Sequence, residues 1–299
     1  MTRPRLARRL ALTVAVGTAL VSAPAALANH PVLVEGNCNN AADPMFSPVP
    51  APGTCGDYDG DGRIGSAEDG DGDRVFGTIN GGNSSAGAAN NGTITVVTSG
   101  LFAETVTLTG NVTLEAAPGV EANVDAVRQG DPRSTARQAA PGIIVDAPPN
   151  RQVIIRNIQS RNWTTGFEIR GGSRVALEGV RAEHNINYGI EVNGAASVSI
   201  SNSEIHSTGR RVNPMSGDFP SMANQPAPGT GIEFDGRSIG VVFSTRVTGS
   251  TGIGIDAEKN DVCLALVTVF DNARGNLRGG KTSNDGSCIG SKNNRGPRR

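Results

Sequence analysis

The chain has 299 residues with 27 basic and 28 acidic side chains, so its formal charge of −1 offers no electrostatic basis for binding nucleic acid. Aromatic residues make up only 4% of the sequence, whereas glycine occurs 40 times. Without the first 28 residues the chain keeps 23 basic and 28 acidic groups, a formal charge of −5. Nucleic acid is therefore not an expected partner.

Residues 1–28 have the three parts of a secretory signal peptide. Four arginines between positions 3 and 9 give a basic start, Leu10–Val21 gives an apolar run, and Ala26-Leu27-Ala28 offers the small-residue pattern read by signal peptidase. The apolar run is shorter than the roughly 20 residues that cross a bilayer, which favours a signal peptide over a membrane anchor. We expect cleavage after Ala28, secretion to the extracellular space and no membrane span.

Residues 29–77 form an irregular segment, with cysteines and prolines, that contains an acidic loop. Positions 1, 3, 5 and 12 of this loop are carboxylates and position 6 is glycine, as in the EF-hand template. The expected Ca²⁺ ligands are Asp57, Asp59, Asp61, Glu68 and the carbonyl oxygen of Arg63. Prolines before the loop exclude a long entering helix, so we predict a lone calcium loop. A solvated acidic linker is the alternative.

The four cysteines fall into two local pairs, Cys38 with Cys55 and Cys263 with Cys288. In an exported protein, disulfides between these near neighbours would staple both ends of the chain. Three connectivities are open, and neither spacing matches a Cys-x-x-Cys metal site.

A repeat of 21–24 residues runs through the middle of the chain. Each unit begins with a glycine followed by alternating apolar residues, and the units start at Gly142, Gly166, Gly189, Gly231 and Gly252, with a weaker one at Gly275. The 42-residue step before Gly231 equals one unit plus an insertion over residues 209–229. A second apolar strand in each unit is expected to turn these residues inward: Val153/Ile155/Ile158, Val175/Leu177/Val180, Val198/Ile200, Val241/Phe243 and Val262/Leu264.

These short strands, separated by glycine, asparagine and serine turns, predict an all-β parallel β-helix over residues 78–280. One unit cannot bury its own apolar row, but rungs stacked about 4.8 Å apart can place isoleucine on isoleucine in a continuous core. A β-sandwich also has short strands, but it lacks self-similarity at this period. A basic tail follows at residues 281–299.

The repeated Gly-Ile-Glu-Val/Phe unit and the opening segment Gly100–Leu108 resemble secreted right-handed parallel β-helix repeat proteins of the pectate-lyase-like superfamily. The resemblance covers roughly residues 92–280 and implies a right-handed coil. Many members of that superfamily bind or cleave polysaccharides, so the resemblance implies an extracellular polymer as the partner. The Asp-Asp and Gly-His-Gly signatures of the superfamily's enzymes are absent here.

Alternation within the aligned units places acidic residues on one exterior face. Glu191 and Glu233 occupy the third position of their units, and Asp235 and Asp256 the fifth. Carboxylates stacked this closely either hold a cation or have raised pKa values. The alternative is a solvent face on which the glutamates pair with Arg170, Arg174 or Arg237.

The acidic face permits two kinds of enzyme. In a polysaccharide lyase the carboxylates would hold calcium against a uronate, and Arg210 or Arg211 would abstract a proton. In an inverting glycoside hydrolase one carboxylate would act as the acid and another as the base, about 6.5–9.5 Å apart, a separation that neighbouring rungs can produce. The candidate catalytic residues are therefore Glu191, Glu233, Asp235, Asp256 and Arg211.

Two further features have a functional and a structural interpretation. His184 and His206 fall close together in the repeat register, which is compatible with a shared metal site or with polar turns. Trp163, the one tryptophan, lies in a predicted turn, where it could stack on a sugar or cover the neighbouring rung.

We therefore favour a secreted, calcium-binding β-helix that engages extracellular polysaccharide or a surface polymer without catalysis. The first alternative is a polysaccharide lyase or glycosidase that uses the acidic face. The second is a structural cell-surface or adhesion protein, held to an anionic wall polymer by the basic residues 292–299.

Overall fold

The computed structural model describes most of the predicted repeat and short strands that precede it. The described residues are 32–35, 75–76, 78–80, 92–127, 133–194, 196–210, 229–258 and 260–283. The signal peptide, the acidic loop, Arg211 and the end of the basic tail lie outside these ranges, so what was expected of them stays a prediction.

The described strands form three parallel sheets, which we call sheets A, B and C. Sheet A contains, in spatial order, β2 (Val75–Phe76), β1 (Val32–Glu35), β3 (Gly92–Thr98), β6 (Val112–Ala116), β9 (Gln152–Arg156), β12 (Arg174–Glu178), β15 (Ser197–Ser201), β18 (Ile239–Phe243), β21 (Asp261–Ala265) and β24 (Lys281–Ser283). Sheet B contains β22 (Thr268–Phe270), β19 (Arg246–Thr248), β16 (Glu204–His206), β13 (Arg181–Glu183), β10 (Ile158–Arg161), β7 (Ala122–Asp125) and β4 (Gly100–Phe102). Sheet C contains β23 (Gly275–Gly279), β20 (Ile253–Ala257), β17 (Thr230–Phe234), β14 (Tyr188–Val192), β11 (Thr165–Gly171), β8 (Ile143–Ala147) and β5 (Val106–Leu108).

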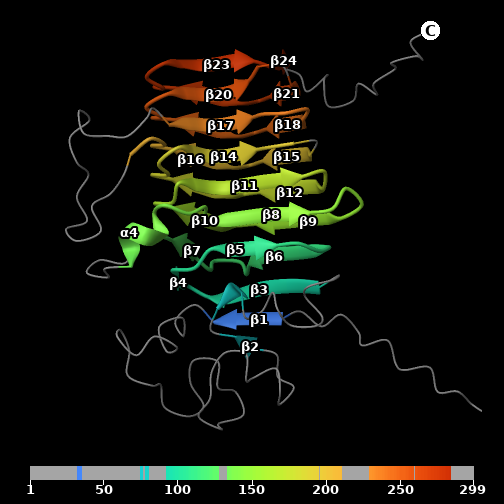
Figure 1. Ribbon diagram of the computed structural model, residues 1–299, viewed down its shortest axis with the longest axis vertical. Helices are drawn as coiled ribbons and strands as arrows, with labels where there is room; N and C mark the ends of the chain where they lie inside the picture. The colour runs from blue at the N-terminus through green and yellow to red at the C-terminus, as the bar shows by residue number, and fades with distance from the viewer. Residues whose placement is uncertain are drawn as a thin grey trace, which may run out of the picture.

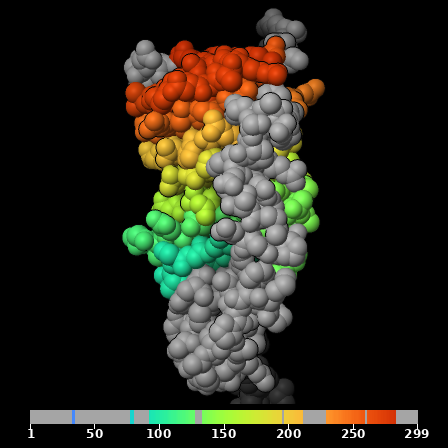
Figure 2. Space-filling view, turned by 90° about the vertical axis from the view of Figure 1, so that its left-hand side faces the viewer, coloured from blue at the N-terminus to red at the C-terminus, as the bar shows by residue number. Residues whose placement is uncertain are grey.

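One rung of the coil takes one strand from each sheet, in the order A, B, C. The rung of β9, β10 and β11 is followed by the rung of β12, β13 and β14, and each strand pairs in parallel with its counterpart. The rungs are stacked in chain order along the long axis (Figure 1), and the colours of Figure 2 follow the same order. The all-β parallel β-helix predicted from the repeat is confirmed.

The coil extends beyond both ends of the predicted range, residues 78–280. β1 and β2 extend sheet A before the first predicted rung, although the segment that contains them was expected to be irregular. At the other end β24 pairs with β21, so the basic tail contributes a strand. The short helix α4 (Ser134–Arg137) lies beside the coil between β7 and β8 (Figure 1). No helix among the described residues is long and apolar enough to span a membrane.

Stacked apolar columns fill the interior. In sheet C one column runs through Ile143, Phe167, Ile190, Ile232 and Ile255, each at most 1% exposed. Each apolar side chain in the column covers the side chains of the rungs above and below it. A fully buried side chain of this size contributes about 1.5–3 kcal/mol to the stability of the fold. The columns therefore stabilise the stack only when the register is kept.

The corner between sheets A and B is a single residue with left-handed backbone. Asn157, Gly179 and Asn202 occupy it in three successive rungs, with φ of 55°, 64° and 51°. Asparagine and glycine tolerate this conformation, whereas Ser244 and Leu266 adopt it in the next two rungs, with φ of 47° and 54°.

One rung of sheet C is aligned differently from the expectation. Ile255 pairs with Ile232 and Asp256 with Glu233, so this unit begins at Gly254 and not at Gly252. The reason is steric: a side chain at Gly254 would collide with Asn272 and Val269, and the glycines that begin the four preceding units are equally crowded. Because glycine and isoleucine alternate from Gly252 to Ile255, the sequence alone allowed the unit to begin at either glycine. The crowded inward position at the start of the unit requires a glycine, and Gly254 occupies it. The last unit is shifted as well, because Gly275 pairs with Ile253 and has nothing within 4 Å of an added Cβ.

The predicted inward residues of β18 are also wrong. Gly240 and Val242 lie opposite the buried Val198 and Ile200, so Val241 and Phe243 face outward. The ring of Phe234 fills the space beside Gly240, where an added Cβ would lie 2.5 Å from the ring. The bulk of Phe234 in sheet C therefore leaves room only for a glycine at position 240 in sheet A. The other second-strand residues named from the repeat are buried as expected.

The insertion leaves and re-enters the coil at one point. An added Cβ on Gly229 would meet the backbone nitrogen of Gly209 at 2.3 Å, so the two ends of the insertion touch. β16 and β17 on either side keep their places in the stack. The 42-residue step is thus one rung with a long excursion.

Adjacent isoleucines in β8 test the assignment of faces. Ile143 is fully buried in the column, whereas Ile144 points outward. We expect Ile143→Ala to lower the free energy of unfolding by about 2–5 kcal/mol because it leaves a cavity. The matched variant Ile144→Ala should cost less than about 1 kcal/mol in the same urea titration. Equal losses would contradict the assigned faces.

Candidate functional site

A row of four carboxyl groups crosses the outer surface of sheet C. Glu168 of β11 pairs with Glu191 of β14, and Glu191 in turn pairs with Glu233 of β17. Glu233 pairs with Asp256 of β20. Since neighbouring strands lie about 4.8 Å apart, the four residues form an unbroken row, which we call the carboxylate ladder.

Arginines neutralise both ends of the ladder. At one end the guanidinium of Arg170 donates two hydrogen bonds to Glu168, of 2.6 and 2.9 Å. At the other end Arg278 of β23 donates to the nearly buried Asp256 and lies 3.6 Å from Glu258. Paired charges of this kind cost little to hold ionised, so the unusual part of the ladder is its centre.

The two central residues have no cationic partner among the described residues. Glu191 accepts hydrogen bonds from the Asn193 amide at 2.9 Å and from the Thr165 hydroxyl at 3.3 Å. Burial, followed by the charge of Glu168, raises the pKa of Glu191. This carboxyl group is thus held by neutral donors only.

Glu233 is the most perturbed member of the ladder. Burial and then the neighbouring charge of Asp256 raise its pKa to about 7, although Arg278 acts in the opposite direction. Among the described residues no hydrogen bond or ion pair reaches its side chain. Glu233 therefore changes its protonation state close to neutral pH.

Tyr188 and Asp235 flank the ladder. Tyr188 begins β14, and burial, followed by the charge of Glu191, raises the pKa of its hydroxyl. The charges of Glu233, Asp235 and Asp256 act on it in the same direction, which places the phenol within the field of the whole cluster. Asp235 follows Glu233 on the outer face and accepts a hydrogen bond from the backbone of Gly236.

The structure brings four of the five candidate catalytic residues to one face and corrects the position of one. Glu191, Glu233 and Asp235 lie where the alternation placed them, but Asp256 stands opposite Glu233 and not opposite Asp235. Arg211 lies outside the described residues. Two participants were missed: Tyr188, and Arg278 in the weakest repeat unit. Of the ion pairs expected for a plain solvent face, only that of Arg170 is present among the described residues.

The histidines and the tryptophan have structural partners. The ring of His206 contacts that of His184 edge-on at 5.6 Å, and its Nε2 lies 2.8 Å from the Glu183 carboxylate. Burial and then His206 lower the pKa of His184 to about 4. No group of three metal-binding side chains occurs among the described residues. Trp163 is fully buried and donates from Nε1 to the carbonyl oxygen of Val124, so it is not available to stack on a sugar.

Cys263 lies in β21, and its three potential partners lie outside the described residues. Both disulfide pairings therefore stay predictions, as do the five calcium ligands.

Comparison with known families supports the architecture. The family model described as "right handed beta helix region" matches residues 141–295, just over half of the chain. The chain belongs to this right-handed β-helix family. No curated protein and no solved structure matches it. The family fixes the fold and the hand of the coil, and the activity has to be argued from the side chains that this β-helix displays.

On this right-handed β-helix the ladder offers two distinct chemical groups next to each other. Glu233 has a pKa of about 7, while Asp256 accepts a hydrogen bond from the Arg278 guanidinium. Neighbouring carboxyl groups in such different environments can divide the roles of acid and base, or can donate and accept hydrogen bonds to the same ligand.

The raised pKa of Glu233 predicts a pH-dependent stability. Below its ordinary pKa of 4.5 the group is protonated in both folded and unfolded chains, and this part of the stability is then fully present. It is lost as the pH rises through about 7, because the folded chain must then carry the charge. The variant Glu233→Gln stays neutral, so its Tm should exceed that of the natural protein by several degrees at pH 8 and by almost nothing at pH 4.

Thermal unfolding followed by circular dichroism at both pH values measures this difference. Glu121→Gln, on an exposed turn of the coil, is the matched control and should show no such trend. A Glu233→Gln advantage that is equal at pH 4 and pH 8 would rule out the raised pKa.

Proposed function

We propose that this protein is a secreted β-helix that binds extracellular polysaccharide through the outer face of sheet C and does not cleave it. The observation that carries the proposal is the centre of the carboxylate ladder, where Glu191 and Glu233 stand on consecutive rungs without a cationic partner among the described residues. Secretion rests on the predicted signal peptide.

The chemistry of the face suits sugar hydroxyls. Carboxylates accept hydrogen bonds from hydroxyl groups, and a protonated Glu233 can also donate one. Tyr188 adds a half-exposed ring and a hydroxyl at the edge of the same cluster. The face is an open sheet surface with a fixed spacing of about 4.8 Å, which suits a repeating polymer better than an enclosed small molecule.

Catalysis by the same face is the alternative, and one observation favours it. Glu233 and Asp256 pair directly, and they differ in environment: the pKa of Glu233 is raised to about 7, and Asp256 accepts a hydrogen bond from Arg278. The distance between the two carboxyl groups, about 5–5.5 Å in retaining glycosidases and wider in inverting ones, would decide the stereochemical course. A polysaccharide lyase would need a proton-abstracting arginine. Of the two candidates, Arg210 lies where its charge acts on His184, and Arg211 lies outside the described residues. The adhesion alternative draws no support from the described residues, because residues 292–299 lie outside them.

Binding and cleavage can be measured on the same samples. The mature protein should be retarded in native gels that contain a polysaccharide from a panel of neutral and acidic polymers, and it should release no reducing ends from any of them. The double variant Glu191→Gln/Glu233→Gln should bind at least about tenfold more weakly, because each neutral amide lacks the charge and one acceptor oxygen of the carboxylate. The control Glu121→Gln/Glu204→Gln removes two charges elsewhere and should bind normally.

Two results would contradict this proposal. Equal losses in the two double variants would show that net charge, and not the ladder, determines binding. Release of reducing ends that is abolished in Glu233→Gln would establish the enzyme in place of the binding protein. A calcium requirement for that release would favour elimination over hydrolysis.

We also propose that Ca²⁺ binds the loop of Asp57, Asp59, Asp61 and Glu68 together with the Arg63 carbonyl. Its support is the five-position match in the sequence. Isothermal titration of the mature protein with calcium should show about one site per chain, which Asp59→Ala removes while Asp71→Ala, outside the template, keeps it. Uptake that is unchanged in Asp59→Ala would reject the loop as the site.

A further inference from the structure

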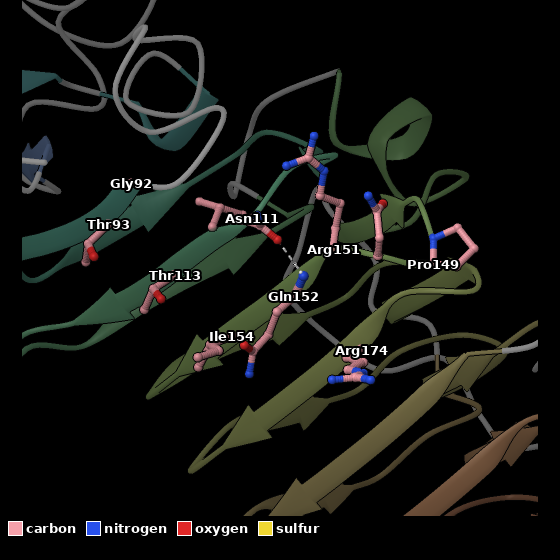
Figure 3. Close-up of a pocket in the computed structure, with 11 residues that line it drawn as sticks. Gly92, Thr93, Asn111, Thr113, Pro149, Arg151, Gln152, Ile154 and Arg174 are labelled. Atoms are coloured by element: carbon pink, nitrogen blue, oxygen red, sulfur yellow. Dashed lines mark hydrogen bonds between the residues drawn. The ribbon is translucent and has the colours of Figure 1, made fainter. Parts of the chain in front are cut away.

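The outer face of sheet A changes in character along the coil. Over β3 to β12 it is polar, and a hollow of about 630 Å³ lies there, lined by Arg151 and Arg174 and by no acidic residue among those described. Figure 3 shows the side chains of this hollow on neighbouring strands, with the backbone nitrogen of Gln152 donating to the Asn111 side-chain oxygen at 2.8 Å. The later strands β18 and β21 carry apolar side chains on the same face.

These apolar side chains form a strip across β18 and β21. Val242 and Leu264 point into the core, so the residues on either side of each point outward. The outward residues, which we call the apolar strip, are Val241, Phe243, Cys263 and Ala265. Ile239 and Leu266 lie at its margins and are 50% and 58% exposed. A contiguous apolar surface of this kind marks a place where another segment or molecule binds.

The centre of the strip is buried although it faces outward. Cys263 lies opposite the exposed Lys281 of β24, yet it is only 8% exposed, and Ala265 has no exposed surface. Lys281 does not cover Ala265, because its Nζ reaches Asp261 at 3.1 Å, in the other direction along β21. Ser199, two strands earlier in the same outward row as Cys263, is exposed. This contrast indicates a covering segment over β21.

The chain after β24 is the segment best placed to cover the strip. Residues 284–299 lie outside the described residues, and they begin beside β21, because β24 pairs with that strand. Asp285-Gly286 is a dipeptide typical of tight turns, so the chain can reverse its direction there. Cys288 follows two residues after this dipeptide, which brings a second sulfur close to Cys263.

The geometry of a disulfide determines on which side this segment can lie. Cys263 is the one cysteine among the described residues, and it is not a free thiol. A disulfide joins Cα atoms that are about 4.4–6.8 Å apart. If Cys288 continued sheet A as a further strand beyond β24, it would lie two strand spacings, or about 9.6 Å, from Cys263. A bond between these two cysteines therefore requires the segment to lie on the outer face of the sheet.

We propose that residues 284–299 form a cover over the outer face of β18 and β21, held by a disulfide between Cys263 and Cys288. The bond forms when the two thiols give two electrons and two protons to an external disulfide, which is reduced to two thiols. The exported state that the signal peptide predicts provides the oxidising surroundings in which such a bond persists.

The cover explains why the coil can end with an apolar face. Ile289 is the one branched aliphatic residue in the sequence after β24, and it packs on Val241 and Phe243 beside the disulfide. The segment also stands next to β24, the last strand of sheet A, whose open edge would otherwise be able to pair with another chain. Reduction of the bond therefore exposes both the strip and the edge.

The first measurement is a peptide map of the full mature protein, which is alkylated with iodoacetamide and digested with trypsin in the absence of a reductant. Cleavage after lysine and arginine gives one peptide of residues 260–274, with Cys263, and one of residues 282–292, with Cys288. Mass spectrometry should find these two peptides joined, and separate after reduction. Alkylated Cys263, or Cys263 joined to either cysteine of the N-terminal segment, would overturn the proposal.

The second measurement tests the cover through the fluorescence of the dye ANS, which binds exposed apolar surface. Cys288→Ser releases the segment and should raise the fluorescence at least about twofold, because the strip becomes accessible. Adding Val241→Ser/Phe243→Ser to that variant should return the fluorescence to the level of the natural protein. The matched control is deletion of residues 290–299, which keeps Cys288 and Ile289 and should leave the fluorescence unchanged.

Circular dichroism shows whether each variant is folded, and the peptide map uses the natural protein, so it tests the proposal even where a variant does not fold. Unchanged fluorescence in folded Cys288→Ser, or an equal rise after deletion of residues 290–299, would overturn the cover. A natural protein that sediments as a dimer, and as a monomer in Val241→Ser/Phe243→Ser, would overturn it as well, because a second copy would then cover the strip.

Discussion

Parallel pairing of each strand with its counterpart one rung away is the constraint on which the rest of the molecule depends. It converts positions in the repeat into columns, so that Ile190 lies under Ile232 and Glu191 under Glu233. Inside the coil this repetition is favourable, because apolar side chains cover each other in water-free layers. Outside, the same repetition brings like charges to within about one strand spacing. The acidic face is therefore a cost imposed by the register unless a ligand, a proton or an arginine offsets it.

The repeat predicted the fold because its signal lies in residues that the core requires. Ile143, Ile190 and Ile232 recur at one period, and no other architecture explains both that period and the alternation. Contacts between sheets left no such signal. Gly240 faces inward because the Phe234 ring occupies its space, and Gly254 begins its unit because Asn272 and Val269 crowd it. The placement of Glu191, Glu233 and Asp235 followed from alternation, whereas the roles of Tyr188 and Arg278 depend on packing and ion pairing that no spacing reveals.

Charge is sorted between the faces of the coil. Sheet C displays carboxyl groups whose centre lacks cations, and one end of sheet A displays arginines without acidic partners among the described residues. Elsewhere, opposite charges are mixed, as where Arg156 joins Glu115 and Glu178. A rigid stack keeps the two kinds of surface apart, because side chains on different sheets point in different directions and cannot neutralise each other. One coil thus presents two chemically different surfaces.

The contact between Gly209 and Gly229 has a consequence for how such a coil can change. Since the chain leaves and returns at the same corner, the segment between these glycines can lengthen, shorten or be exchanged while the rungs on both sides stay paired. That corner adjoins Thr230 at the start of β17, next to Tyr188 on the outer face of sheet C. A loop of different length or sequence joined at this corner would start next to the outer face of sheet C, and the paired rungs would not have to refold.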